Sequence, residues 1–258
     1  QRDDNVNPIR QSVCFGNFLR NGLSAQSLIE SAAQIGYASI EMLSEEHWTA
    51  VFDQGLSIAC GVGHASLPDG LNKRANHDRI EAELLANIDK AAARGIGSLI
   101  AFSGNREGLS DQEGRDNCVE GLLRVKDAAE AAGVTVCMEL LNSKVNHPDY
   151  QCDRTAWGVQ LCQRVKSSRV RLLYDIYHMQ IMEGDLIRNI TDYIDCIGHF
   201  HTAGNPGRQD LDDEQEIYYP PIMKAIAASD YQGYVGHEYR PKAGTIASLE
   251  HAFGVCDV

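Results

Sequence analysis

Short apolar runs alternate with longer amphipathic segments along the whole chain. The short runs have the length of β-strands, and the longer segments repeat their apolar positions with the period of an α-helix. Strands are predicted at 9–15, 38–42, 56–65, 98–102, 135–140, 170–174, 196–201 and 233–238. Helices are predicted at 25–35, 76–94, 154–165, 186–195, 221–229 and 246–256, and a further helix begins at Asp111 or Asp116 and ends at Ala132.

Strand–helix units that follow one another in this way predict an α/β fold of the (β/α)8 TIM-barrel type. The 258 residues fit a single domain of this kind, in which residues 1–8 are expected to be an extended N-terminal segment. The alternative is a doubly wound open sheet. That fold is disfavoured because no GxGxxG motif follows the first strand and because acidic strand ends accumulate late in the chain.

Four side chains that can bind a divalent metal stand where predicted strands end. They are Glu139, Asp175, His201 and Glu238. A parallel barrel gathers the C-terminal ends of its strands on one face, so these residues can converge on one ion. Three carboxylates and one imidazole suit Mn²⁺, Mg²⁺ or Co²⁺, and Zn²⁺ also accepts such ligands. The alternative for any one of them is a helix N-cap or a solvated loop position.

Glu139 and Glu238 are also a candidate catalytic pair. A carboxylate can take a proton from a carbon beside a carbonyl, while a bound metal polarises the carbonyl oxygen and stabilises the enediolate. Two carboxylates on opposite sides of a substrate could remove and return that proton. This is the chemistry of an aldose–ketose isomerase or an epimerase.

Three further polar residues are candidates for binding substrate. His178, in DIYHMQ, can hydrogen-bond a substrate oxygen, and Arg208, in NPGR, can bind a carboxylate through two parallel hydrogen bonds. His64, in GVGHA, ends the third predicted strand and can line the pocket. For His178 and Arg208 the alternatives are a packed loop histidine and a surface arginine.

Other residues near strand ends have weaker claims. Glu41 ends the second predicted strand and could support the ligands from behind, while Trp48 and Phe15 could wall off the site or simply pack. His237 is excluded as a ligand because side chains alternate along a strand and Glu238 is its neighbour. His199 shares a face with His201 but does not stand at the strand end, so it is also excluded.

The overall charge narrows the range of partners. The net charge is −13 and the isoelectric point is about 5.1, which disfavours nucleic acid because phosphate backbones require basic patches. No apolar run is long enough to span a membrane. We therefore expect a small-molecule substrate, with neither nucleic acid nor membrane as a partner, and leave open whether the chain forms a homo-oligomer.

The eight cysteines include no CxxC pair, and several lie in strand-like runs. A free thiol in such a run behaves as a small apolar residue, so most of them are expected to be reduced and buried. This favours a cytoplasmic location. The sequence begins at Gln1 rather than Met, which leaves export to the periplasm open if a leader preceded it.

With these residues in place, the chain resembles the xylose-isomerase-like TIM-barrel superfamily and, within it, the hydroxypyruvate isomerase family. The resemblance covers nearly the whole chain and is densest over 134–241, in MELLNS, YDIYHMQIMEGD, NPGR, EIYY and GHEYRP. It implies a metal held by Glu139, Asp175, the residue at 201 and Glu238. It also implies Glu139 and Glu238 as acid and base, with His178 and Arg208 at substrate-contacting positions of ketose 3-epimerases.

The chain departs from the family at two places. Hydroxypyruvate isomerases usually carry Gln where this chain has His201, and His is usual in the ketose 3-epimerase branch. The region GHASLPDGLN also differs from the usual isomerase sequence.

The resemblance implies conversion of hydroxypyruvate to tartronate semialdehyde through an enediolate. The alternatives are a ketose 3-epimerase or other sugar isomerase and, outside enzymes, a sugar-binding barrel without catalysis. The endonuclease branch is disfavoured because it needs more His ligands and a basic face.

Overall fold

The structure, a computed structural model, describes residues 9–258, so the extended segment expected at residues 1–8 lies outside it. Eight strands are present, all parallel, and their hydrogen-bonded order is β2-β1-β8-β7-β6-β5-β4-β3. This sequential order, with helices between the strands, confirms the predicted (β/α)8 class. The strands are β1 (Arg10–Cys14), β2 (Ser39–Glu41), β3 (Cys60–Val62), β4 (Ser98–Ala101), β5 (Thr135–Glu139), β6 (Val170–Asp175), β7 (Ile197–Thr202) and β8 (Tyr234–His237).

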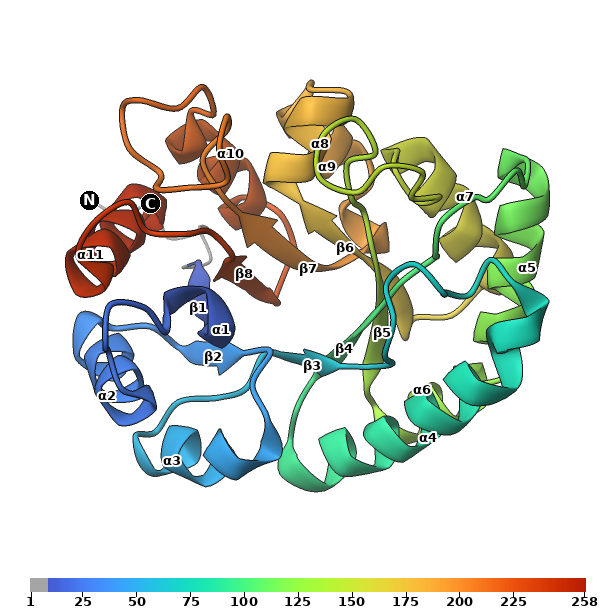
Figure 1. Ribbon diagram of the computed structural model, residues 1–258, viewed down its shortest axis with the longest axis horizontal. Coiled ribbons are helices and arrows are strands. Elements are labelled where there is room, and N and C mark those ends of the chain that lie inside the picture. Colours follow the sequence, from blue (N-terminus) through green and yellow to red (C-terminus); the bar gives the residue numbers. More distant parts are fainter. Residues whose placement is uncertain (1–8) are drawn as a thin grey trace. The chain divides into compact units, whose positions relative to one another are not determined.

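The helices fill the intervals between the strands (Figure 1). They are α1 (Phe15–Phe18), α2 (Ala25–Ile35), α3 (Trp48–Asp53), α4 (His77–Arg94), α5 (Asp111–Leu123), α6 (Lys126–Ala132), α7 (Thr155–Val165), α8 (Ile176–Met182), α9 (Leu186–Asp192), α10 (Tyr219–Ala227) and α11 (Thr245–Cys256). Short 3-10 turns occur at Glu45–His47, Arg74–Asn76 and Ile194–Cys196. Among residues 9–258, no helix is both long and apolar enough to cross a membrane.

The described chain divides into two compact units. Unit 1 comprises residues 9–59, Asp185–Ile194 and Phe200–Val258, and unit 2 comprises Cys60–Gly184 and Asp195–His199. Strand β7 therefore begins in unit 2 and ends in unit 1. The single-domain organisation expected from the sequence stays a prediction.

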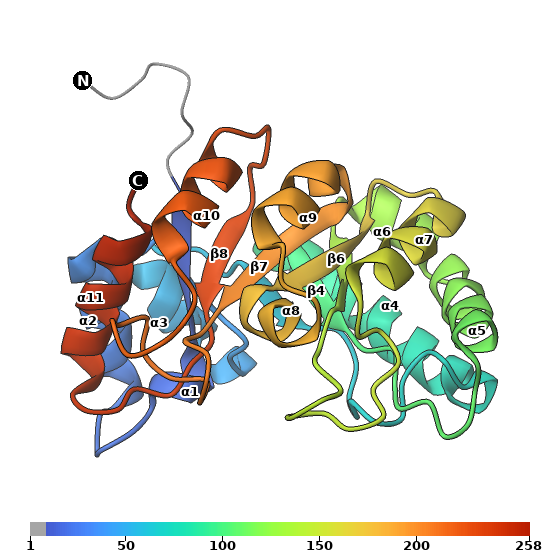
Figure 2. The same cartoon turned by 90° about the horizontal axis from the view of Figure 1, so that it is seen from above.

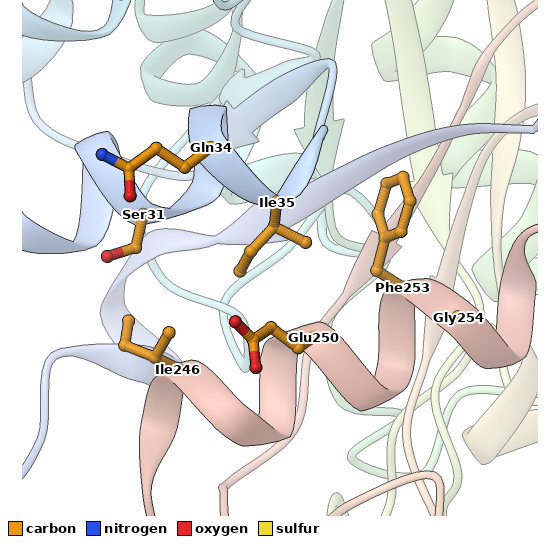
Figure 3. Close-up of a pocket in the computed structure, with 7 residues that line it drawn as sticks. All are labelled: Ser31, Gln34, Ile35, Ile246, Glu250, Phe253 and Gly254. Carbon is orange, nitrogen blue, oxygen red and sulfur yellow. The ribbon is translucent and has the colours of Figure 1, made fainter.

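In unit 1, β1 is the central strand. Val13 is in register with Ile40 of β2 on one side and with His237 of β8 on the other. Helices α2 and α11 lie side by side (Figures 1 and 2), and Leu28 and Leu249 are fully buried. A surface pocket of about 380 Å³ lies between these two helices (Figure 3). Its lining includes none of the residues predicted for the site: Ser31, Gln34, Ile35, Ile246, Glu250, Phe253 and Gly254.

In unit 2, β5 is paired with β4 and β6. Val136 is in register with Leu99 and Val170, and all three are buried. Helix α5 packs on α7, and α4 packs on α6 (Figure 1). A Cβ on Gly158 of α7 would lie 2.7 Å from Leu172 of β6. Because that distance is too short for two carbon atoms, glycine allows this helix to approach the strand closely.

The structure corrects two predicted boundaries. The predicted strand 56–65 pairs with β4 only over Cys60–Val62, and its beginning forms a single bridge from Ser57 to Ser39. The predicted helix ending at Ala132 is two helices, α5 and α6. Of the two proposed starts, Asp111 is the observed one. Ser110 accepts from the backbone of Glu113 while the Glu113 carboxylate accepts from the backbone of Ser110, which is the reciprocal cap that the sequence SDQE encodes.

Candidate active site

Unit 2 carries Glu139 and Asp175 at the ends of adjacent parallel strands. Glu139 is the last residue of β5 and Asp175 the last of β6, and both are buried. The β5 end is fixed by Tyr150, whose hydroxyl donates to the backbone carbonyl of Glu139 at 2.9 Å. The two buried carboxylates thus stand at the same end of two paired strands.

Asp175 has a structural task as well. Its Oδ1 accepts a hydrogen bond from the backbone N–H of His178 at 2.9 Å and so caps α8. The N-cap alternative considered for a single acidic strand end is therefore realised here. Oδ2 of the same carboxylate lies 3.8 Å from Nε2 of His178. The cap orients the Asp175 carboxylate against the first turn of α8, which carries His178.

Asn142 orients the ring of His178, and sequence reasoning missed it. The Asn142 amide oxygen accepts from the backbone N–H groups of Val145 and Asn146 at 2.9 and 2.8 Å. Its amide nitrogen must then face His178, and it lies 2.6 Å from Nδ1. Because Nδ1 accepts this bond, the proton of the neutral ring is on Nε2. The signal was the Asn in MELLNS, directly after the β5 end.

Unit 1 carries the other two predicted ligands in direct contact. Nδ1 of His201, in β7, lies 3.2 Å from Oε2 of Glu238, which follows β8. Neighbouring ligands of an octahedral ion with bonds of about 2.1 Å lie about 3 Å apart. An imidazole nitrogen and a carboxylate oxygen at this separation therefore fit the same divalent cation.

Arg208 forms an ion pair with Glu238. Its Nη2 donates to Oε2 of Glu238 at 2.6 Å, and its backbone carbonyl accepts from the N–H of Arg240 at 3.0 Å. Arg208 adopts a left-handed backbone conformation with φ of 55°. A guanidinium has five N–H donors, so Arg208 can donate hydrogen bonds to a second carboxylate while it keeps the bond to Glu238.

Glu41 and Cys14 surround the other edge of the His201 ring. Glu41, the last residue of β2, places Oε1 at 2.6 Å from Nε2 of His201. The Cys14 thiol donates to the same oxygen at 3.4 Å. Burial is the main cause that raises the pKa of the Cys14 thiol well above its ordinary value, and the charge of Glu41 is the second. The thiol thus stays protonated, although Cys14, Glu41 and His201 are close enough to share an ion.

The structure places His64 in a backbone network. Its Nδ1 lies 2.9 Å from the carbonyl of Ala65, and its Nε2 accepts from the N–H of Phe102 at 2.9 Å. Burial lowers the pKa of His64, which keeps the ring neutral. Both ring nitrogens are engaged in this arrangement, and the substrate-binding role stays a prediction.

His237 is held away from Glu238. Its Nδ1 lies 2.7 Å from the hydroxyl of Thr202 and its Nε2 lies 2.8 Å from Oε1 of Gln11. The side chain is fully buried, and burial lowers its pKa to about 3. Both ring nitrogens are thus engaged within the core, and the exclusion of His237 as a ligand stays a prediction.

The buried His237 predicts an acid-sensitive fold. A group whose folded pKa is lowered to about 3 binds fewer protons than the unfolded chain below about pH 6.5. The neutral His237 side chain therefore favours the folded state fully above that pH. As the pH falls from about 6.5 toward 3, the free energy of unfolding decreases by about 1.4 kcal/mol per pH unit. We expect the free energy of unfolding, measured with urea, to fall less between pH 7 and pH 4.5 in His237→Gln than in the wild type. Equal changes in both proteins would contradict this.

Comparison with known proteins identifies the family. The profile described as "Xylose isomerase-like TIM barrel" matches residues 29–253, and the chain belongs to this family. It is 37% identical over 135 residues to the 2-oxo-tetronate isomerase of Cupriavidus necator, a match that covers 52% of this chain and 51% of that protein. It is 40% identical over 113 residues to the hydroxypyruvate isomerase of Escherichia coli, which covers 43% of each. These matches span about half the length of the relatives.

Solved structures share the fold over almost the whole chain. An AP endonuclease, family 2, from Brucella melitensis has a TM-score of 0.83 and 25% identity, and the match covers 93% of this chain and 97% of that one. D-Psicose 3-epimerase from Clostridium cellulolyticum H10 has a TM-score of 0.77 at 17% identity, with 97% and 100% covered. The second likeness concerns the fold alone.

Proposed function

We propose that the protein is a divalent-metal-dependent isomerase that converts hydroxypyruvate to tartronate semialdehyde through an enediolate. The observation that carries the proposal is the unit 1 arrangement, in which Arg208 lies beside Glu238 and Glu238 lies beside His201. This arrangement brings together a guanidinium that could bind a substrate carboxylate, a carboxylate that could act as base and an imidazole that could bind the metal. The proteins named as isomerases of 2-oxo acids among the relatives support the same class.

The metal would be held by Glu139 and Asp175 from unit 2 and by His201 and Glu238 from unit 1. Glu139 and Asp175 end their strands, His201 is the last residue but one of β7, and Glu238 directly follows β8. The family's barrel fold gathers such strand ends on one face. Oxygen-rich sets with one nitrogen suit Mn²⁺, Mg²⁺ or Co²⁺. When bound, the metal supplies Lewis-acid polarisation of the substrate carbonyl.

The two glutamates would move the proton. One carboxylate removes a proton from the hydroxymethyl carbon of hydroxypyruvate, and the C–H electron pair becomes the carbon–carbon double bond of the enediolate. The other glutamate, which starts the turnover as the carboxylic acid, then delivers its proton to the former carbonyl carbon, while the hydroxyl proton moves between the two oxygens. Exchange with solvent afterwards returns both glutamates to their starting states. No atom is gained or lost, so the product is tartronate semialdehyde. A general base of this kind contributes about 10²–10⁴ to the rate.

His178 and Arg208 would orient the substrate. The proton that Asn142 leaves on Nε2 of His178 makes that nitrogen a hydrogen-bond donor for a substrate oxygen. Arg208 would bind the substrate carboxylate, because a guanidinium matches a planar anion. A local cation is needed because the chain carries a net charge of −13.

A ketose 3-epimerase is the second candidate. It is favoured by His201, since the hydroxypyruvate isomerase family usually carries Gln at this place. The same carboxylate pair could remove and return a proton on a neutral sugar, which would use Arg208 less.

A substrate panel followed by NMR tests the proposal. The purified chain would be incubated in the presence of Mn²⁺ with one substrate at a time. The substrates would be hydroxypyruvate, 2-oxo-tetronate and several neutral ketoses. We expect hydroxypyruvate to be converted fastest. Turnover of neutral ketoses alone would contradict the proposal and support the ketose 3-epimerase. Binding of a sugar without turnover of any substrate would indicate a sugar-binding protein.

A further inference from the structure

Glu41 is a carboxylate beside the predicted ligand His201 that no step of the proposed reaction uses. It is fully buried, and its Oε1 lies 2.6 Å from Nε2 of His201. The distance is that of a short, charge-assisted hydrogen bond. The thiol of Cys14 donates to the same oxygen at 3.4 Å. Sγ of Cys14 also lies 3.5 Å from Nε2 of His201, so Glu41 Oε1 is the nearer of two acceptors for the thiol hydrogen. A carboxylate oxygen that accepts this bond can also accept a hydrogen from Nε2.

The neighbouring strand is built to admit this carboxylate. A Cβ added to Gly236 of β8 would lie 2.8 Å from both carboxylate oxygens of Glu41. Real Cβ atoms do not approach oxygen so closely, so any larger residue at 236 would displace the Glu41 side chain. Gly236 is in register with Ser12 of β1 and with His201 of β7. Glycine at this position therefore keeps the space beside the His201 ring open.

The two edges of the His201 ring have different contacts. On the Nε2 edge, the 2.6 Å separation from Glu41 suits a shared proton. On the Nδ1 edge, the 3.2 Å separation from Glu238 suits two ligands of one cation. A neutral imidazole carries one proton, so a proton on Nε2 leaves the lone pair on Nδ1.

We propose that Glu41 is a positioning residue that fixes the tautomer and the orientation of His201, so that Nδ1 is presented to the divalent cation. The inference rests on the proposed function for the cation and on the unit 1 geometry for the tautomer. A carboxylate on the far nitrogen of a ligating histidine also raises the basicity of the near one, and its loss costs about 10- to 100-fold in metal affinity. Glu41 would thus strengthen the metal site without touching substrate or metal.

The tautomer can be tested without metal. Long-range ¹H–¹⁵N spectra of the metal-free chain distinguish protonated from unprotonated ring nitrogens, and the signals of His201 are those absent from His201→Ala. We expect the Nε2–H tautomer in the wild type. The Nδ1–H tautomer for His201 would overturn the inference, whatever the enzyme's substrate proves to be.

Metal affinity gives the second readout. Calorimetric titration with Mn²⁺ should show binding that is weakened about 10- to 100-fold in Glu41→Gln, at an unchanged unfolding temperature. Gly236→Ala keeps Glu41 but displaces its carboxylate, and it should weaken binding in the same direction. Glu250→Gln, the same chemical change on the exposed face of α11, should bind as the wild type does.

The outcomes separate the two proposals. If wild type binds Mn²⁺, His201→Ala does not, and folded Glu41→Gln binds as tightly as wild type, the positioning role is wrong and the metal site stands. If His201→Ala binds as tightly as wild type, the metal site itself is wrong, and the role of Glu41 in it fails too. Should Glu41→Gln not fold, Gly236→Ala and the wild-type tautomer decide the question.

Discussion

Replacing either Glu139 or Glu238 with Gln is expected to abolish proton exchange while leaving substrate binding largely intact. Gln preserves the shape of the side chain and still offers an oxygen to a cation, but it cannot accept a proton from carbon. Loss of a general base typically costs about 10²–10⁴ in rate. We expect kcat to fall by about this factor, and deuterium from solvent to be absent from recovered substrate and product when the reaction is followed by NMR.

The position of Glu238 makes its variant the more informative of the two. Its Oε2 contacts both Nδ1 of His201 and Nη2 of Arg208, so an amide there also alters an ion pair. We therefore expect Glu238→Gln to raise KM modestly as well, and Glu139→Gln to change mainly kcat. The exposed Glu250→Gln is the control for loss of one negative charge. Near-normal deuterium incorporation by both active-site variants would rule out the two-carboxylate mechanism.

Arg208→Lys is expected to raise KM for hydroxypyruvate by about 10- to 100-fold, because hydrogen bonds to charged groups are worth about 1.5–3 kcal/mol. Lys keeps the positive charge but loses the planar fork that matches a carboxylate. A neutral ketose offers hydroxyls and a carbonyl instead, so the same variant should change its KM less. The measurement is a kinetic comparison of wild type and variant on both kinds of substrate.

The structure sharpens this second expectation. Lys at 208 can still neutralise Glu238, because an ammonium can replace the contact that Nη2 makes at 2.6 Å. Arg208→Gln removes the charge and should lower kcat as well as raise KM. An equal effect of Arg208→Lys on hydroxypyruvate and on neutral ketoses would contradict a role in binding the substrate carboxylate.

Much of the fold was predictable because its determinants are local. Alternation of short apolar runs with amphipathic segments indicated all eight strands. Gly36, Gly95 and Gly133, each in a left-handed conformation, cap the ends of α2, α4 and α6, which is a local signal as well. What escaped prediction depended on partners distant in sequence. The run 56–65 is apolar throughout, and only its pairing with β4 decides that Cys60–Val62 is the strand. Helix α8 was not predicted, because it follows β6 directly and its start at Asp175 was assigned first to a metal ligand, with the N-cap as the alternative.

The candidate site divides in the same way. Strand-end position marked Glu139, Asp175, His201 and Glu238, because an acidic or imidazole group after an apolar run is visible in one dimension. The roles of Asn142 and Gly236 were not visible in the sequence. The role of Asn142 depends on a loop that turns its amide toward His178, and that of Gly236 on the space it leaves beside Glu41. Those contacts join residues from different strands and loops, which a linear pattern does not contain.

The most direct test of the account is titration of the metal-stripped chain with Mn²⁺ while the isomerisation of hydroxypyruvate is followed by NMR. We predict no turnover in the presence of chelator, and a rate that rises with added Mn²⁺ and saturates at one ion per chain. Full activity of the stripped chain in chelator, or no conversion of hydroxypyruvate at any concentration of Mn²⁺, Mg²⁺ or Co²⁺, would contradict the account.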